Sequence, residues 1–350
     1  MSFNIRGFGS GKDRKIGDFK KLMCREQPWI VALQETKCNT IDEKWVKLIS
    51  GFDDVGFVQK EKVGKSGGLL LFWDKNDFLA EQVHKDEFYI AVKGKWRGRD
   101  EPLIIVNVYG PHDDANKQKL WASLKNFVGQ YDVAWVLCGD FNEVREESER
   151  QSCVFMEKRA KWFNEFINNA QLIDVPLGGK RFTRICDNGI KFSKLDRFLI
   201  SEKFNDMWDE VSAIALERKM SDHCPIVLRD RAIDFGPKPI KVFDEWLVVE
   251  GAEKIINEAW KAKVSSQRLD CVFRLKLKNV KIALKEWSQR TFGKLDMEIE
   301  GLKNEACDWE KMAEDKILTD DERGKWLDIR KKMDRFRKSQ DKHGKAKVSG

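Results

Sequence analysis

The chain has 350 residues, 41% of them hydrophobic and 13 of them Trp, which is enough for one large domain or two ordinary ones and excludes global disorder. The formal net charge of +7 comes from residues 251–350, because these hold 25 Lys and Arg against 18 Asp and Glu, whereas residues 1–250 are neutral overall. The apolar runs are too short for a membrane span, no secretory signal is visible, and the 8 Cys lack close pairs. We therefore expect an intracellular protein with reduced cysteines.

Residues 1–232 predict an α/β domain. Apolar runs typical of strands covered on both faces lie at Ile30–Leu33, Gly67–Trp73, Pro102–Tyr109, Val133–Cys138 and Pro225–Leu228. Asp18–Glu26 and Arg159–Ala170 have helical spacing. The irregular alternation indicates mixed sheets instead of a regular strand–helix–strand repeat.

The composition changes at residues 233–247, a predicted linker that contains Gly236-Pro237-Lys238-Pro239. Residues 248–330 are rich in Lys, Glu, Leu and Trp and predict a helical connector of long helices, arranged as an antiparallel hairpin or a coiled coil. Gly293 and Gly301 would weaken a continuous helix there. Residues 331–350 are predicted to form a basic, disordered tail.

Short polar clusters follow or flank the predicted strands. They are Gln34-Glu35-Thr36-Lys37, Tyr109-Gly110-Pro111, Gly139-Asp140-Phe141-Asn142, Lys194-Leu195-Asp196-Arg197 and Ser221-Asp222-His223-Cys224-Pro225. Strand ends on one side of a sheet are close in space even when they are far apart in sequence. This pattern therefore predicts a hydrolytic metal site at one rim of the sheet.

Glu35 and the pair Asp140 and Asn142 are the first candidates for chemical roles. A carboxylate at a strand end suits a hard cation such as Mg²⁺. Strand alternation predicts that Asp140 and Asn142 share a face, where they could activate a water and bind a phosphate oxygen. The alternatives are a surface or capping glutamate and an ordinary Gly-Asp turn.

His223 is singled out by Asp196, which lies in another strand-like run, Ser193–Ile200, and can orient the imidazole and raise its basicity. An isolated histidine is otherwise an ordinary core or surface residue. Tyr109 and Asn4 can each be interpreted in two ways. They are either structural residues at strand ends or contacts to phosphate or metal. The order of these clusters over about 220 residues favours the functional reading.

The motifs resemble those of the endonuclease/exonuclease/phosphatase superfamily. The resemblance rests on Ser2–Gly7, Leu33–Lys37, Asn107–Pro111, Gly139–Asn142, Leu195–Phe198 and Ser221–Ile226. Gly67–Trp73 and Phe235–Pro239 narrow it to the apurinic-endonuclease-like domain of plant LINE-type (non-LTR) retrotransposon polyproteins. It covers residues 1 to about 245, and residues 246–345 resemble more loosely the helical connector that leads to the reverse transcriptase.

This resemblance implies an α/β fold, a four-layer α-β-β-α sandwich of two mixed sheets followed by a mostly helical C-terminal extension. It implies a DNA endonuclease that uses Mg²⁺, or Mn²⁺ in its place, and leaves a 3′-hydroxyl, as in the priming of retrotransposon reverse transcription. Carried over by position, Glu35 binds the metal with Asn4 and Asp222 near it, Asp140 activates water, Asn142 and Tyr109 hold the phosphate, and the His223–Asp196 pair stabilises developing charge. DNA is the implied partner, element RNA is a second one through the basic tail, and access to the nucleus is required.

The sequence departs from the family pattern at several positions. Arg6 stands where DNA-repair relatives have an aspartate that assists the metal, which argues against activity on abasic sites. Arg184 replaces an expected tryptophan. No Phe/Tyr-x-Asp-Asp polymerase signature occurs, because Gly51-Phe52-Asp53-Asp54 has the wrong spacing, so we expect a product truncated before the reverse transcriptase.

Two alternatives remain open from the sequence. The chain could be an inactive retrotransposon remnant that acts as a nucleic-acid-binding or helical interaction module. It could also be a phosphatase or an RNase of the same superfamily.

Overall fold

The computed structural model describes residues 1–8, 12–63, 66–186, 191–208, 211–230, 251–264 and 269–346. The predicted linker at residues 233–247 lies outside them. The chain divides into two compact units. One comprises Met1–Asp234 together with Glu310–Leu327, and the other comprises Phe235–Trp309 together with Asp328–Gly350. No helix in the described ranges is long and apolar enough to cross a bilayer.

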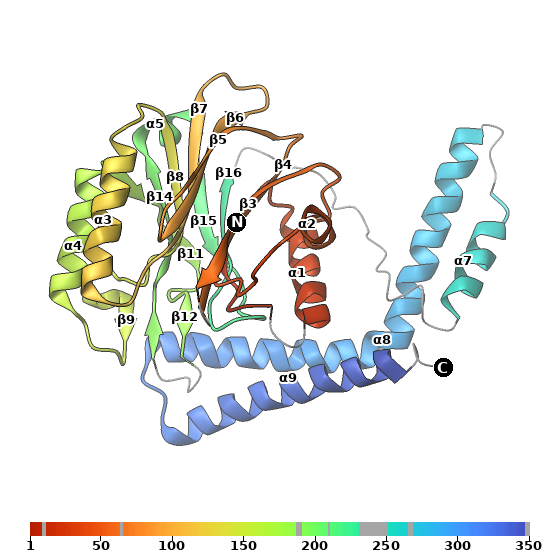
Figure 1. Ribbon diagram of the computed structural model, residues 1–350. Coiled ribbons are helices and arrows are strands. Elements are labelled where there is room, and N and C mark those ends of the chain that lie inside the picture. The colour runs from red at the N-terminus through yellow and green to blue at the C-terminus, as the bar shows by residue number, and fades with distance from the viewer. Residues whose placement is uncertain are drawn as a thin grey trace. The chain divides into compact units, whose positions relative to one another are not determined.

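Two large mixed sheets form the centre of the first unit (Figure 1). The first sheet has the order β11 (Leu177–Gly179), β15 (Val211–Ala215), β16 (Ile226–Asp230), β1 (Ser2–Asn4), β2 (Ile30–Gln34), β4 (Ser66–Asp74) and β3 (Val55–Val63). The second has the order β10 (Leu172–Asp174), β14 (Asp196–Ser201), β8 (Ala134–Asp140), β7 (Pro102–Tyr109), β6 (Tyr89–Trp96) and β5 (Phe78–Lys85). The pairs β1–β2, β11–β15 and β7–β8 are parallel, and the other pairs are antiparallel.

Helices cover the outer face of each sheet. The helices α1 (Lys12–Glu26) and α2 (Glu43–Ser50) pack on the first sheet through a cluster that includes Phe19, Val46 and Phe72. The helices α3 (Asp114–Val128) and α4 (Glu157–Asn169) pack on the second sheet through aromatic side chains such as Trp121 and Phe163.

A third apolar cluster fills the space between the two sheets. It combines Leu71 and Trp73 of the first sheet with Ile90, Val136 and Phe198 of the second. Side chains of a strand alternate between its two faces, so each central strand supplies both this inner core and an outer one. The arrangement confirms the predicted four-layer α-β-β-α sandwich.

Smaller elements complete this unit. They are the helix α5 (Glu202–Met207), the 3₁₀ turn η1 (Glu147–Glu149), and a small sheet of β12 (Arg184–Ile185), β13 (Phe192–Ser193) and β9 (Arg150–Gln151). This small sheet lies beside the strand ends that carry the polar clusters, because Arg184 also forms a backbone bridge with His223.

The C-terminal region is helical. It contains α7 (Ala252–Lys261), α8 (Leu269–Asp315) and α9 (Asp320–Ala346), and Ala306 of α8 packs with Ile329 and Met333 of α9. Helix α8 continues through Gly293 and Gly301. Helix α9 extends to Ala346 and so differs from the expected disorder beyond residue 330, because Lys, Arg and Gln are good helix formers and acidic residues occupy the first turn of α9.

Buried amides join the two sheets. The side chain of Gln34 donates to Asn107 Oδ1 at 2.7 Å, and Asn107 Nδ2 donates to the carbonyl oxygens of Leu33 and Leu70, each at 3.0 Å. Gln34 and Asn107 are both fully buried. Because a buried polar group must find partners inside the protein, these bonds fix the alignment of the sheets behind the polar clusters.

Replacing Asn107 with Ala should lower the free energy of unfolding by about 2 kcal/mol or more. It removes the bond from the buried Gln34 amide to the second sheet, and it takes one donor from each of the buried carbonyls of Leu33 and Leu70. Urea unfolding monitored by tryptophan fluorescence measures this loss. Asn126→Ala on the exposed face of α3 is the matched control and should change the stability by less than about 0.5 kcal/mol. Equal effects of the two substitutions would contradict the structural role of Asn107.

Candidate active site

Six side chains named by the sequence meet at one rim of the sandwich. Asn4 ends β1, Glu35 follows β2, Tyr109 ends β7, Asp140 ends β8, Asp196 begins β14, and His223 precedes β16. The last two belong to the same rim because β14 runs antiparallel to β8, and β16 antiparallel to β1. Asp140 is directly opposite both Tyr109 and Asp196 in the strand register.

The amide of Asn4 connects the two sheets at this rim. Its Nδ2 donates to Glu35 Oε1 at 3.1 Å and to Asp140 Oδ2 at 2.8 Å. Its Oδ1 accepts the backbone N–H of Arg6 at 3.1 Å. A fully buried amide therefore uses both donor hydrogens to hold two carboxylates at a set separation.

Glu35 is oriented by three donors. In addition to Asn4, the Tyr109 hydroxyl donates to Glu35 Oε1 at 3.0 Å, and Lys37 Nζ lies 3.2 Å from Oε2. Burial favours the neutral acid, but these three donors prevail and hold the pKa of Glu35 below its usual value. Burial and the charges of Glu35 and Asp140 raise the pKa of Tyr109, so its hydroxyl remains a hydrogen-bond donor.

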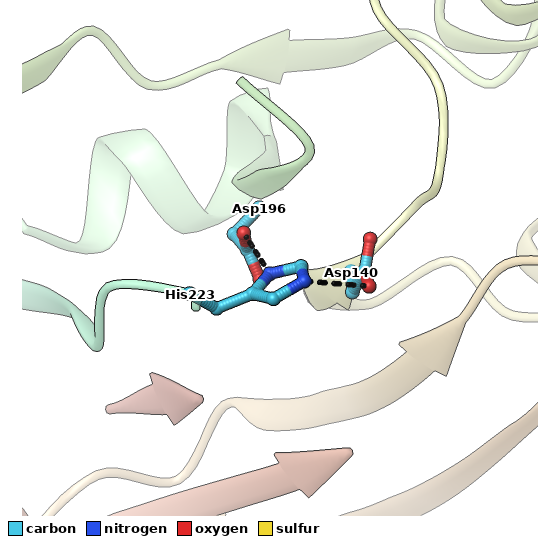
Figure 2. A group of neighbouring side chains, drawn as sticks. All are labelled: Asp140, Asp196 and His223. Carbon is cyan, nitrogen blue, oxygen red and sulfur yellow. Dashed lines mark hydrogen bonds and ion pairs between the residues drawn. The ribbon is translucent and has the colours of Figure 1, made fainter. Parts of the chain in front are cut away.

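His223 lies between two aspartates, as Figure 2 shows. Its Nδ1 is 2.8 Å from Asp196 Oδ2, and its Nε2 is 3.7 Å from Asp140 Oδ2. Burial would lower the pKa of His223, but the charges of Asp196 and Asp140 raise it to about 9. The imidazole is therefore a buried cation at neutral pH.

Asp140 is buried, and the pKa of its carboxyl group is close to neutral pH. The residue is 1% exposed, and burial raises the pKa of Asp140 to about 6, against the opposing effects of His223 and of the Asn4 hydrogen bond. A carboxylate with a pKa just below the working pH is mostly ionised and still basic enough to accept a proton from water.

Asn142 reaches the site through a turn. Strand β8 ends at Asp140, Phe141 is buried in the outer core, and Asn142 has the left-handed φ of 50°. Its backbone N–H donates to Asp140 Oδ1 at 2.9 Å, and its Nδ2 donates to the carbonyl of Gly110 at 2.7 Å. Asn142 is therefore positioned by this turn, and not by the strand alternation that the sequence predicts for it.

A buried lysine supports the same turn. The sequence motifs do not single out this residue as part of the site. Lys117 of α3 donates to the carbonyl of Asn142 at 2.6 Å and ion-pairs with Glu143 at 3.0 Å, and both charged side chains are 1% exposed. The only local signal is a lysine on the apolar face of α3, because Lys117 is three residues before Leu120 and four before Trp121.

Asp222 is bound by two arginines. Arg6 Nη1 is 2.9 Å from Asp222 Oδ2, and Arg184 Nε is 3.3 Å from the same atom. Burial opposes ionisation, but the positive charges of His223, Arg6 and Arg184 hold the pKa of Asp222 below its usual value. Its assignment as a metal ligand stays a prediction, and in this arrangement a cation would have to compete with two guanidinium groups.

Glu35 fits a hard divalent cation well. It is ionised, 14% of its side chain is exposed, and one oxygen is held by Asn4 and Tyr109 while the other contacts only the half-exposed Lys37 among the described residues. A separate group, Asp140, Asp196 and His223, has potential ligand atoms within 4.8 Å of one another. The hydrogen bond between His223 and Asp196 makes this second group better suited to holding a proton than a metal.

The fold and these side chains define the class of phosphoester hydrolases that gather acidic and amide groups at the rim of a two-sheet sandwich. Residues 1–223 match the model of the endonuclease/exonuclease/phosphatase family. The chain belongs to this family, whose members hydrolyse phosphate esters and phosphodiesters with divalent metals.

Solved structures with low sequence identity share the fold. An AP endonuclease from Leishmania major is 16% identical and matches 64% of this chain and 85% of its own, with a TM-score of 0.54. An AP endonuclease from Archaeoglobus fulgidus is 17% identical and matches 66% of this chain and 98% of its own, with a TM-score of 0.51. A 3′ phosphatase from Neisseria bound to a product DNA hairpin is 19% identical, with coverages of 65% and 97% and a TM-score of 0.50.

We expect the imidazole of His223 to titrate near pH 9 in the metal-free protein, because Asp196 and Asp140 stabilise the protonated ring. A ¹H–¹⁵N NMR titration of the histidine side chains measures the midpoint. Asp196→Asn removes the negative charge that raises the pKa of His223 most and should lower the midpoint by about 1 pH unit or more. An unchanged midpoint in that variant would show that the ion pair does not form.

Proposed function

We propose that this chain is a divalent-metal-dependent endonuclease that nicks DNA and leaves a 3′-hydroxyl. The observation that carries the proposal is the hydrogen-bonded convergence of Glu35, Asn4, Asp140 and His223 at one rim. It supplies an ionised carboxylate for a cation, a base for water and a fixed positive charge within one cluster.

The side chains divide the reaction between them. Asp140 accepts a proton from a water whose oxygen attacks the phosphorus, and the bond from phosphorus to the 3′ oxygen breaks. His223, kept protonated by Asp196, stabilises the negative charge that develops on the phosphoryl oxygens. Without substrate, the single hydroxyl hydrogen of Tyr109 orients Glu35. When substrate binds, we assign this hydrogen and the side chain of Asn142 to the phosphate.

Glu35 would hold Mg²⁺, or Mn²⁺ in its place, with Asn4 next to it. When bound, this ion would neutralise the phosphate and the leaving oxygen. DNA as the substrate is supported by the hairpin complex of the Neisseria phosphatase, although that similarity extends to the fold alone.

We further propose that the enzyme is of the LINE-type retrotransposon class, in which a nick primes reverse transcription. The motifs of the sequence support this narrower assignment. The ion pair between Arg6 and Asp222 supports it as well, because it puts a guanidinium where repair enzymes are expected to have a metal-assisting aspartate. Such an enzyme acts in the nucleus and has no preference for abasic sites.

Supercoiled plasmid should be converted to the open-circular form in the presence of Mg²⁺ and not with excess EDTA. Asp140→Asn and His223→Ala should each lower the rate about a hundredfold or more, because one removes the base and the other the positive charge. Gel electrophoresis of timed samples measures the rates.

The exposed Asp53 provides the matched control, and Asp53→Asn should nick at the wild-type rate. Absence of nicking by folded wild-type protein with either Mg²⁺ or Mn²⁺ would reject the endonuclease. Salt-dependent DNA binding without nicking would then favour the inactive remnant.

Glu35→Gln should weaken cation binding by roughly tenfold or more, because it removes the negative charge while its amide oxygen can still accept from Asn4 and Tyr109. Electron paramagnetic resonance of free Mn²⁺ measures the dissociation constant without any need for activity. Glu61→Gln on the exposed surface of β3 is the control. Equal affinity in wild type and Glu35→Gln would exclude Glu35 as a ligand.

A further inference from the structure

Part of the C-terminal helical region belongs to the same compact unit as the sandwich. Residues Glu310–Leu327 form the end of α8, the connecting turn and the start of α9. Ala313, Leu318 and Trp326 are buried there. Gln151 of β9 donates its amide to the carbonyl of Ala313 at 2.7 Å, which links this segment to the small sheet beside the active site.

Glu310 is the charged centre of this contact. It is 7% exposed, it accepts a hydrogen bond from Lys180, and Arg218 Nη1 lies 3.0 Å from its Oε2. The side chains of Arg218 and Lys180 are 1% and 11% exposed. Burial would lower the pKa of both cations, but the charge of Glu310 contributes to raising them, so Lys180 and Arg218 remain charged.

Arg218 connects this carboxylate to the backbone of the active site. Its Nε donates to the carbonyl of Asp222 at 2.9 Å, and its Nη2 donates to the carbonyl of Phe182 at 3.3 Å. Asp222 immediately precedes His223. One guanidinium therefore holds the segment that carries the catalytic histidine.

The segment that contains Phe182 positions Asp196, the hydrogen-bond partner of His223. The hydroxyl of Thr183 accepts the backbone N–H of Asp196 at 3.1 Å, and the carbonyl of Thr183 accepts the N–H of Cys224 at 2.7 Å. The two carbonyls that Arg218 holds thus belong to the segments that bear and align the His223–Asp196 pair.

A buried guanidinium requires a counter-charge, because leaving it unpaired in a water-poor environment is strongly unfavourable. Within the described parts of the chain, Glu310 is the carboxylate that ion-pairs with Arg218. Glu310 lies 87 residues beyond the family match, which ends at residue 223. Among the described residues of the sandwich, no carboxylate forms an ion pair with Arg218, although the charge of Asp222 also acts on it. Its direct counter-charge therefore comes from the helical extension.

We propose that Glu310 is a positioning residue for the His223–Asp196 pair, acting through Arg218, and that the segment Glu310–Leu327 is an integral part of the catalytic unit. The proposal rests on the proposed nuclease function. It places the boundary of the working enzyme within the helical extension instead of at the end of the sandwich.

Glu310→Gln, made in the full chain, tests the proposal with two readouts. We expect kcat for plasmid nicking to fall about tenfold to a hundredfold with KM changed by less than about twofold, since a small displacement of a catalytic group affects chemistry more than binding. We also expect the His223 side-chain resonances of the metal-free protein to shift. Glu310→Asp, which keeps the charge, should recover most of the kcat, and Glu305→Gln on the exposed face of α8 should match the wild type.

Arg218→Lys is the second variant, used if Glu310→Gln does not fold. It keeps an ion pair with Glu310 but cannot donate to both carbonyls, so it should lower kcat and shift the same resonances. Wild-type kcat and wild-type His223 resonances in either folded variant would overturn the proposal, whatever the melting temperature. If wild-type protein does not nick DNA, the proposed function fails, and the resonances alone decide whether Glu310 positions His223.

Discussion

The hydrogen bonds of Asn4 are the constraint on which the active site depends. One buried amide donates to Glu35 of the first sheet and to Asp140 of the second, so it determines how far the proposed cation ligand is from the proposed base. Two carboxylates held near each other would repel, and the two donor hydrogens of the amide offset that repulsion without adding a positive charge. An aspartate at this position would add a third negative charge and remove both donors.

The relative position of the two sheets therefore has chemical consequences. Gln34 and Asn107 hold the sheets together one layer below the rim, and the apolar core between the sheets has no directional bonds that could do so. If the sheets slid, Asp140 would move away from Glu35 while the fold stayed intact. Buried amides at this interface are thus part of the geometry of the site, although both side chains are fully buried.

The sequence predicts those parts of the molecule whose signal is local. The strands β2, β4, β7 and β8 are continuous apolar runs because both of their faces are covered, and the site residues follow directly after such runs or stand in motifs of the family. Strands β3 and β5 are not predicted. Strand β3 is an edge strand of the first sheet and β5 is an edge strand of the second, and their polar or exposed positions interrupt the apolar pattern. Lys117 with Glu143 and Gln34 with Asn107 are also missed, because the meaning of each residue depends on a partner 26 or 73 positions away.

Glu310 is the extreme case of this dependence on distant partners. On a helix rich in Glu and Lys, a single glutamate looks like a solvated surface residue, and nothing in its neighbourhood separates it from Glu305. What gives Glu310 a different role is the burial of Arg218, 92 positions earlier, whose own hydrogen bonds go to the backbone beside His223. The ion pair between Glu310 and Arg218 thus connects the helical extension to the backbone beside His223. Through this connection we propose that a change in the extension affects the site.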